Sequence, residues 1–109
     1  MNRLNALVVA LVVSSPVKAD FLDGNTLYKY MTEQSSYSNG VAAGYVIGVH
    51  DSNAGVEHCA PSNVTVKQTV DVVRAHLAAF PSLRHHYAET IVTYALQKAW
   101  PCKDKGNPT

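Results

Sequence analysis

The chain has 109 residues, of which 47% are hydrophobic and 16% are charged. That length is room for one domain, and the balance is typical of a folded globular protein and excludes an intrinsically disordered one. The formal net charge is +1, with 9 basic and 8 acidic residues, so no basic surface for nucleic acid is indicated. Two cysteines are too few for a zinc site built from four cysteines and enough for one disulfide.

The first 19 residues are typical of a cleaved secretory signal peptide. Arg3 precedes an apolar run over 4–13, and Ala19 supplies the small residue at which signal peptidase cuts. The run is too short to span a bilayer, which needs about 20 apolar residues. We therefore expect cleavage after Ala19, one mature domain over 20–109, no membrane segment afterwards, and an oxidising compartment.

The mature chain begins with a predicted helix over 23–34, for which Asp23 is a suitable N-cap. Serines and an asparagine then predict a loop over 35–39. No repeat or low-complexity tract follows, so the remaining elements belong to the same domain.

The segment 40–52 is ambiguous, because its valines and isoleucine have β propensity while its glycines have helical spacing. Gly40, Gly44 and Gly48 recur every four residues, which places them on one side of a helix. Each glycine costs a helix about 1 kcal/mol relative to alanine. We interpret the segment as a helix whose glycine row packs closely against another helix.

The clearest helical signal follows the predicted loop 53–63. Thr65 and Gln68 have the spacing of a capping box. Apolar residues then recur in steps of four and three, at Val66, Val70, Val73, Leu77 and Phe80. Pro81 and Ser82 end this helix and begin a short connection.

A last helix is predicted over 86–100 and ends before Pro101. Its expected buried side comprises Ala88, Ile91, Val92, Ala95, Leu96 and Ala99. The sequence therefore predicts an all-α fold, a small bundle of about four helices.

The two cysteines fit this topology. Because the last two helices are joined by a short connection, we expect them to be antiparallel, with the start of one beside the end of the other. Cys59 precedes the first of them and Cys102 follows the second. Export and this geometry together predict one disulfide that staples the bundle, with a stabilisation of roughly 4 kcal/mol in the chain-entropy model.

No catalytic or metal-binding constellation is indicated. His85 and His86 each have ligand spacing to Glu89, but a closed site needs three or four ligands, and we interpret them as solvated histidines. His58 next to Cys59 is no nucleophile pair, since catalytic cysteine and histidine are rarely sequence neighbours and the disulfide would consume the thiol. We therefore expect no enzyme, no metal and no cofactor.

Several segments resemble the Tai/Rap family of bacterial immunity proteins. The resemblance covers nearly the whole mature chain, and it is specific in the order and spacing of its pieces. These are DGNTL at 23–27, GYVIGVHD at 44–51, CAPSNVTVKQ at 59–68, AL at 95–96 and WPC at 100–102.

The resemblance implies a small, exported, all-helical protein in the periplasm that forms a homodimer. It implies inhibition of a peptidoglycan amidase delivered by type VI secretion, with a protruding loop that blocks the amidase groove. Cys59 and Cys102 match the family's later cysteine pair. The glycine-rich helix of the family matches residues with an implied structural role, namely Gly44, Tyr45, Gly48 and Asp51.

The chain also departs from the family pattern, because Met31 and Ala42 occupy the positions that correspond to an additional cysteine pair. A whole disulfide is therefore absent, and we expect the fold to survive that loss. The alternative function is a periplasmic or phage-encoded helical binding module with no amidase partner. An adjacent amidase gene would favour the first function.

A rigid inhibitor should present a loop held at both ends by well-packed elements, because preorganisation limits the entropy lost on binding. The connection between the last two helices meets that description, with an apolar Leu83 and with Arg84, which can pair with carboxylates. An ordinary helix–helix connection and the loop 53–58 are the alternatives. The predicted partner-binding residues are Pro81, Ser82, Leu83, Arg84, His85 and His86.

Overall fold

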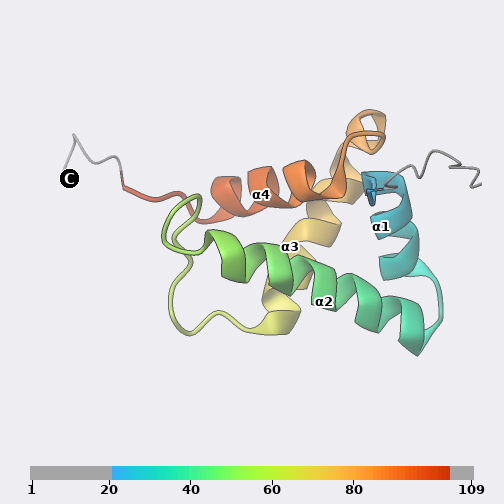
Figure 1. Cartoon of the computed structure of the whole chain (residues 1–109), viewed down its shortest axis with the longest axis horizontal. Helices are drawn as coiled ribbons and strands as arrows, with labels where there is room; N and C mark the ends of the chain where they lie inside the picture. Colours follow the sequence, from blue (N-terminus) through green and yellow to red (C-terminus); the bar gives the residue numbers. More distant parts are fainter. Residues whose placement is uncertain (1–20, 104–109) are drawn as a thin grey trace, which may run out of the picture.

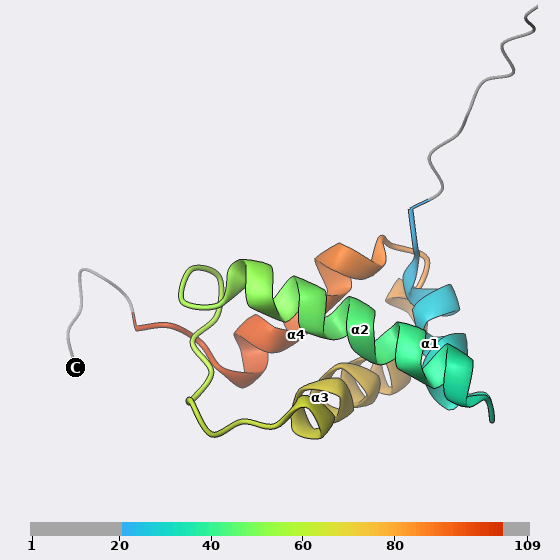
Figure 2. The same ribbon diagram turned by 60° about the horizontal axis from the view of Figure 1, so that its bottom comes forward.

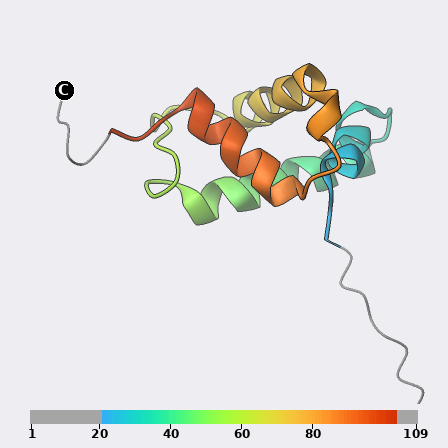
Figure 3. The same ribbon diagram turned by 90° about the horizontal axis from the view of Figure 1, so that it is seen from above.

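The computed structural model describes residues 21–103, and the predicted signal peptide lies outside the described residues. The elements are α1 (Gly24–Thr32), α2 (Ser36–Asn53), α3 (Val66–Ala79), the short 3-10 helix η2 (Pro81–Leu83) and α4 (Ala88–Ala99). Helices α2, α3 and α4 surround the core, and α1 closes one end (Figures 1 and 3). The predicted all-α fold is confirmed. None of the described helices has the length and apolar character needed to cross a membrane.

Side-chain caps start the helices where the sequence indicates them. The Asp23 carboxylate accepts a hydrogen bond from the backbone N–H of Thr26 at 2.8 Å. The Thr65 hydroxyl accepts one from the backbone N–H of Gln68 at 3.0 Å. Each bond satisfies an N–H group that the first turn of a helix leaves without a partner, so both predicted N-caps are confirmed.

The predicted loop over 35–39 is wrong, because α2 already begins at Ser36. Ser35 is the N-cap of α2 and accepts a hydrogen bond from the backbone N–H of Ser38 at 3.1 Å. The Asn39 side chain donates to the carbonyl of Tyr30 at 2.7 Å, near the end of α1. The polar residues that indicate a loop are therefore the cap and first turn of a helix, and α1 ends at Thr32.

One apolar core joins all four α-helices, and α4 contributes the largest share of it. The expected buried side of α4 is confirmed except at Ala99, which is exposed, and the expected stripe of α3 is exposed at Val66 and Phe80, near its two ends. The buried hydrophobic residues are Leu27, Ala42, Val46, Val49, Val73, Leu77, Ala88, Ile91, Val92, Ala95 and Leu96.

The expected close packing of the glycine row is wrong for this fold. A Cβ atom added to Gly40, Gly44 or Gly48 would meet no atom within 4 Å, because α2 turns its opposite side, with Val46 and Val49, toward the core. The close backbone approach occurs at Gly24 instead, where an added Cβ would lie 2.5 Å from Ile91 Cδ1 and 2.7 Å from the Arg84 carbonyl oxygen.

Helix α4 begins two residues later than predicted, at Ala88. A β-bridge pairs Asp23 with Tyr87 and keeps this part of the chain extended. The backbone N–H of Gly24 donates to the His86 carbonyl at 2.9 Å, and that of Ala88 donates to the Leu22 carbonyl at 2.8 Å. The start of α1 therefore decides where α4 can begin.

The disulfide between Cys59 and Cys102 is confirmed, with 4.8 Å between the two Cα atoms. Helices α3 and α4 run in roughly opposite directions, so the segment before α3 meets the segment after α4 at the end of the molecule opposite α1 (Figures 1 and 2). The backbone N–H of Cys59 also donates to the Trp100 carbonyl at 2.8 Å. A covalent bond and a hydrogen bond thus close the same end of the bundle.

Candidate functional site

The connection between α3 and α4 is held rigidly by its neighbours. The Arg84 Nε–H donates to the Leu77 carbonyl at 2.7 Å, which ties the connection to the last turn of α3. The backbone N–H groups of Gly24 and Asn25 donate to the His86 and Arg84 carbonyls at 2.9 and 2.8 Å, which ties it to the start of α1. The connection therefore has the preorganisation expected of a binding loop.

Five of the six predicted partner-binding residues are exposed, and the sixth, Arg84, holds the connection against its neighbours. Arg84 is partly buried, and its guanidinium carbon lies 4.0 Å from the centre of the Tyr28 ring. Together with the bond to the Leu77 carbonyl, this contact fixes the side chain across α1 and α3. The exposed residues are Pro81, Ser82, Leu83, His85 and His86.

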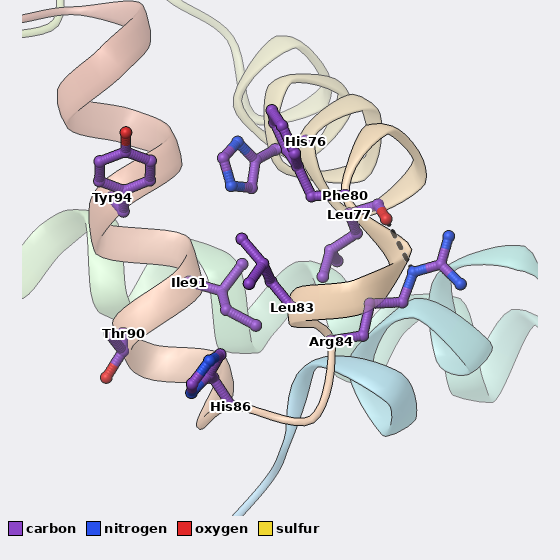
Figure 4. A pocket seen from close by; sticks show the side chains of 9 residues that line it. All are labelled: His76, Leu77, Phe80, Leu83, Arg84, His86, Thr90, Ile91 and Tyr94. Carbon is purple, nitrogen blue, oxygen red and sulfur yellow. Dashed lines mark hydrogen bonds between the residues drawn. The ribbon is translucent and has the colours of Figure 1, made fainter.

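The connection also forms one wall of a pocket of about 150 Å³ (Figure 4). Leu77 and Ile91 form its apolar floor and are nearly completely buried. Its rim is apolar but accessible, since Phe80 is 47%, Leu83 43% and Tyr94 49% exposed. Four more residues complete the lining, namely His76, Arg84, His86 and Thr90.

The sequence did not reveal that His76, Phe80, Thr90 and Tyr94 belong to this surface. They come from different turns of α3 and α4 and meet only when the helices pack. The His76 ring centre lies 4.9 Å from that of Phe80 and 5.5 Å from that of Tyr94. Tyr94 lies outside the apolar stripe of α4, and this is the one signal in the sequence that could have indicated an accessible aromatic surface here.

Burial, followed by the nearby Lys98 ammonium, lowers the pKa of His76 below its ordinary value. The Lys98 Nζ atom lies 5.9 Å from the centre of the Tyr94 ring, beside the pocket. His76 is therefore a neutral ring at pH 7, and Arg84 is the permanent cation among the lining residues.

The alternative loop, over 53–58, is a second rigid feature at the opposite end of the molecule. Gly55 adopts φ 81°, a left-handed conformation that favours glycine, and its N–H donates to the His58 carbonyl at 2.8 Å. The Asn53 side chain donates to the Thr93 hydroxyl at 3.1 Å and anchors the loop to α4. Val56, at the tip, is 77% exposed.

His58 is buried at the base of this loop. Its side chain is 0% exposed, and neither ring nitrogen has a hydrogen-bond partner among the described residues. The centre of the His50 ring lies 4.7 Å away, and His50 Nδ1 lies 3.3 Å from the exposed carboxylate of Asp51. Burial, with a smaller contribution from His50, lowers the pKa of His58.

Acidification is expected to destabilise the fold. Because His58 and His76 both have a lowered pKa, they stay neutral in the folded chain while the unfolded chain takes up protons near about pH 6.5. The free energy of unfolding is therefore highest above about pH 6.5 and falls as the pH drops below it. Urea melts at about pH 7.5 and about pH 5.5 measure the difference.

A matched pair of variants tests whether a buried histidine causes this loss of stability at acidic pH. His58→Leu removes the buried titrating ring and should reduce the loss of stability at acidic pH. His85→Leu changes an exposed histidine and should leave the loss as it is in the parent. A parent chain with the same urea midpoint at both pH values would contradict the burial of neutral histidines.

A second pocket of about 310 Å³ lies where the start of α1 meets α2 and α4. Tyr45, one of the residues with an implied structural role, lines it and packs against the core, and burial followed by Glu89 raises the pKa of its phenol. Phe21 and Tyr87 form its exposed side as an edge-to-face pair with ring centres 5.9 Å apart. Within residues 21–103, no three His, Cys, Asp or Glu side chains lie together as a group that could hold a metal ion.

The family comparison covers almost the whole described chain. A family model described as Rap1a immunity proteins matches residues 23–102, a range that includes the four α-helices, both cysteines and both rigid loops. None of the curated proteins matches the chain. The match confirms the resemblance seen in the sequence, and the chain belongs to the family of Rap1a immunity proteins.

Proposed function

We propose that the protein is a periplasmic immunity protein that binds and inhibits a peptidoglycan amidase effector of type VI secretion. Membership of the Rap1a immunity family is the observation that carries this proposal. The Cys59–Cys102 disulfide supports an oxidising compartment, and the N-terminal sequence pattern supports export by a signal peptide over 1–19 with a mature domain over 20–109.

The connection 81–86 and the adjoining pocket form the proposed contact surface. Leu83 and Phe80 are accessible apolar side chains on a part of the fold that three hydrogen bonds hold in place. Interfaces of this kind depend on a few apolar anchors on a rigid frame. A homodimer is the proposed oligomeric state, and sedimentation at several concentrations tests it directly.

The test begins with a search for a peptidoglycan amidase gene beside the gene of this chain, and an amidase found there is the partner in the assay. The double variant Phe80→Asp with Leu83→Asp should weaken inhibition of peptidoglycan cleavage by about 100-fold, because charged groups replace the apolar anchors. Cells that secrete this amidase into the periplasm should lyse with the variant and survive with the parent.

Two further variants make the result specific. Tyr37→Asp, at a side chain that is 80% exposed on α2, serves as the matched control and should inhibit like the parent. If Val56→Asp abolishes inhibition and the double variant does not, the contact belongs to the loop 53–58. If the folded parent chain neither binds nor inhibits the amidase, the protein is a helical binding module without an amidase partner.

A further inference from the structure

We propose that the second pocket, where the start of α1 meets α2 and α4, receives a basic side chain of the bound partner protein, an arginine guanidinium or a lysine ammonium. This inference rests on the proposed function, because it assumes that the bound macromolecule is a protein. It goes beyond that function by adding a second contact point and the charge of the partner group. The pocket combines three aromatic rings with one carboxylate, and its lining is Phe21, Leu22, Tyr45, Tyr87 and Glu89.

The aromatic rings offer their faces to a cation. Phe21 is 70% exposed and Tyr87 63%, although phenylalanine is among the residue types most often buried. Their ring planes meet at 73° with the centres 5.9 Å apart, so the two rings form a corner on the exposed side of the pocket. Tyr45 adds a third ring from α2. The face of an aromatic ring attracts a cation within about 6 Å of its centre, and pockets lined by several rings bind ammonium groups in this way.

Glu89 supplies a negative charge to the same pocket. Among the described residues that line the pocket there is no base, and Glu89 is the one carboxylate. Its Oε2 atom accepts a hydrogen bond from the Thr93 hydroxyl at 3.2 Å, and that hydroxyl accepts one from the Asn53 side chain at 3.1 Å, which fixes the carboxylate beside α2. Within residues 21–103, Glu89 takes part in no ion pair. A cation that enters therefore meets an unneutralised carboxylate as well as the rings, and an anion is repelled.

The backbone holds the pocket together and places it next to the connection 81–86. The backbone N–H of Ala88 donates to the Leu22 carbonyl at 2.8 Å, and a β-bridge pairs Asp23 with Tyr87. The segment before α1 therefore lies beside the start of α4 (Figures 1 and 3). Tyr87 directly follows the connection, so a protein bound to the connection can place a neighbouring side chain in this pocket. This position is why we assign the cation to the bound protein.

The experiment is a titration of the chain purified from the periplasm, followed in proton–nitrogen correlation NMR spectra. The probes are N-acetyl-arginine methylamide and N-acetyl-citrulline methylamide, which have nearly the same shape and differ in charge. We expect the arginine probe to shift the amides of Leu22, Tyr87 and Glu89 with a dissociation constant on the order of 10 mM. The neutral citrulline probe should bind at least about fivefold more weakly.

Variants separate the contributions of charge and rings. Glu89→Gln keeps an oxygen acceptor for the Thr93 hydroxyl and removes the charge, so the preference for arginine over citrulline should largely disappear. Tyr87→Leu keeps the backbone bridge to Asp23 and removes one ring, so the arginine probe should bind at least about threefold more weakly. Glu57→Gln, the same change at an exposed carboxylate of the loop 53–58, is the matched control and should bind like the parent.

The amidase assay tests the source of the cation. The double variant Tyr87→Leu with Glu89→Gln leaves the connection 81–86 intact and should weaken inhibition by at least about tenfold. If this variant inhibits like the parent although the parent binds the arginine probe, the assignment to a partner side chain is overturned in favour of a free amine.

Three results would overturn the cation site itself: equal affinity for the two probes, shifts that map elsewhere, or an arginine preference retained by a folded Glu89→Gln variant. Probe binding that appears only after acetylation of the α-amino group of the chain would make that group the occupant and would overturn the assignment as well. A chain that inhibits the amidase but fails to bind the probe would refute this pocket alone. A chain that binds the arginine probe but inhibits no amidase would support the cation site and refute the proposed function.

Discussion

Replacing Cys59 and Cys102 together with alanine is expected to lower the free energy of unfolding by about 2–4 kcal/mol. The disulfide joins residues 43 apart in the sequence, so its loss gives the unfolded chain many more conformations. A domain of this size has a free energy of unfolding of roughly 5–15 kcal/mol, and the loss is therefore a large share. Urea melts followed by circular dichroism measure it.

Reduction of the parent chain is the matched control. With both thiols free, the parent should unfold at nearly the same urea concentration as the double variant. Alkylation without reductant should add no group to the native protein, and alkylation after reduction should add two. A double variant as stable as the oxidised parent would mean that the hydrogen bond from Cys59 to the Trp100 carbonyl and the core packing suffice to hold this end.

Gly24→Ala is expected to destabilise the fold by about 1–3 kcal/mol, although alanine is normally the better helix residue. The new methyl group would lie 2.5 Å from Ile91 Cδ1 and 2.7 Å from the Arg84 carbonyl oxygen. That oxygen cannot move freely, because it accepts the hydrogen bond from the backbone N–H of Asn25 at 2.8 Å. The substitution therefore strains the joint between α1 and the connection 81–86, and urea melts measure the loss.

Gly44→Ala is the matched control, because it makes the same chemical change on an open face of α2. It should raise the free energy of unfolding by up to about 1 kcal/mol through helix propensity. The two substitutions are thus expected to have opposite signs. Destabilisation by Gly44→Ala would show that the glycine row is covered in solution, and stabilisation by Gly24→Ala would contradict the close approach at the start of α1.

The start of α3, the buried side of α4 and the disulfide could be predicted because their signals are local. A capping box acts within three residues, and the 3.6-residue period of α4 selects a single apolar side. The pairing of Cys59 with Cys102 could be predicted from the antiparallel order of two helices. The serines at the start of α2 led to a wrong prediction for the same reason, because the side-chain hydrogen bond by which a serine favours a loop is also the bond by which it caps a helix.

For the candidate site, the sequence identified the connection 81–86 as an accessible segment between two helices, and the structure added its surroundings. The sequence suggests that Arg84 is a free charge, but in the structure its Nε–H donates a hydrogen bond to the Leu77 carbonyl. His76 and Tyr94 come from separate helices and meet at the pocket only after packing. The sequence gives no distance between such residues, because their contact depends on how the helices cross.

By itself the sequence determined that the protein is all-helical and disulfide-stapled, and its resemblance to the family covered most of the chain. Only the tertiary structure decided which side of α2 is buried, because apolar residues occur on several sides of that helix, with Val41 exposed and Val46 in the core. It likewise decided that His58 is buried and that Gly24 is the close contact. Caps and periodicity act within a few residues, whereas burial depends on which distant element lies alongside.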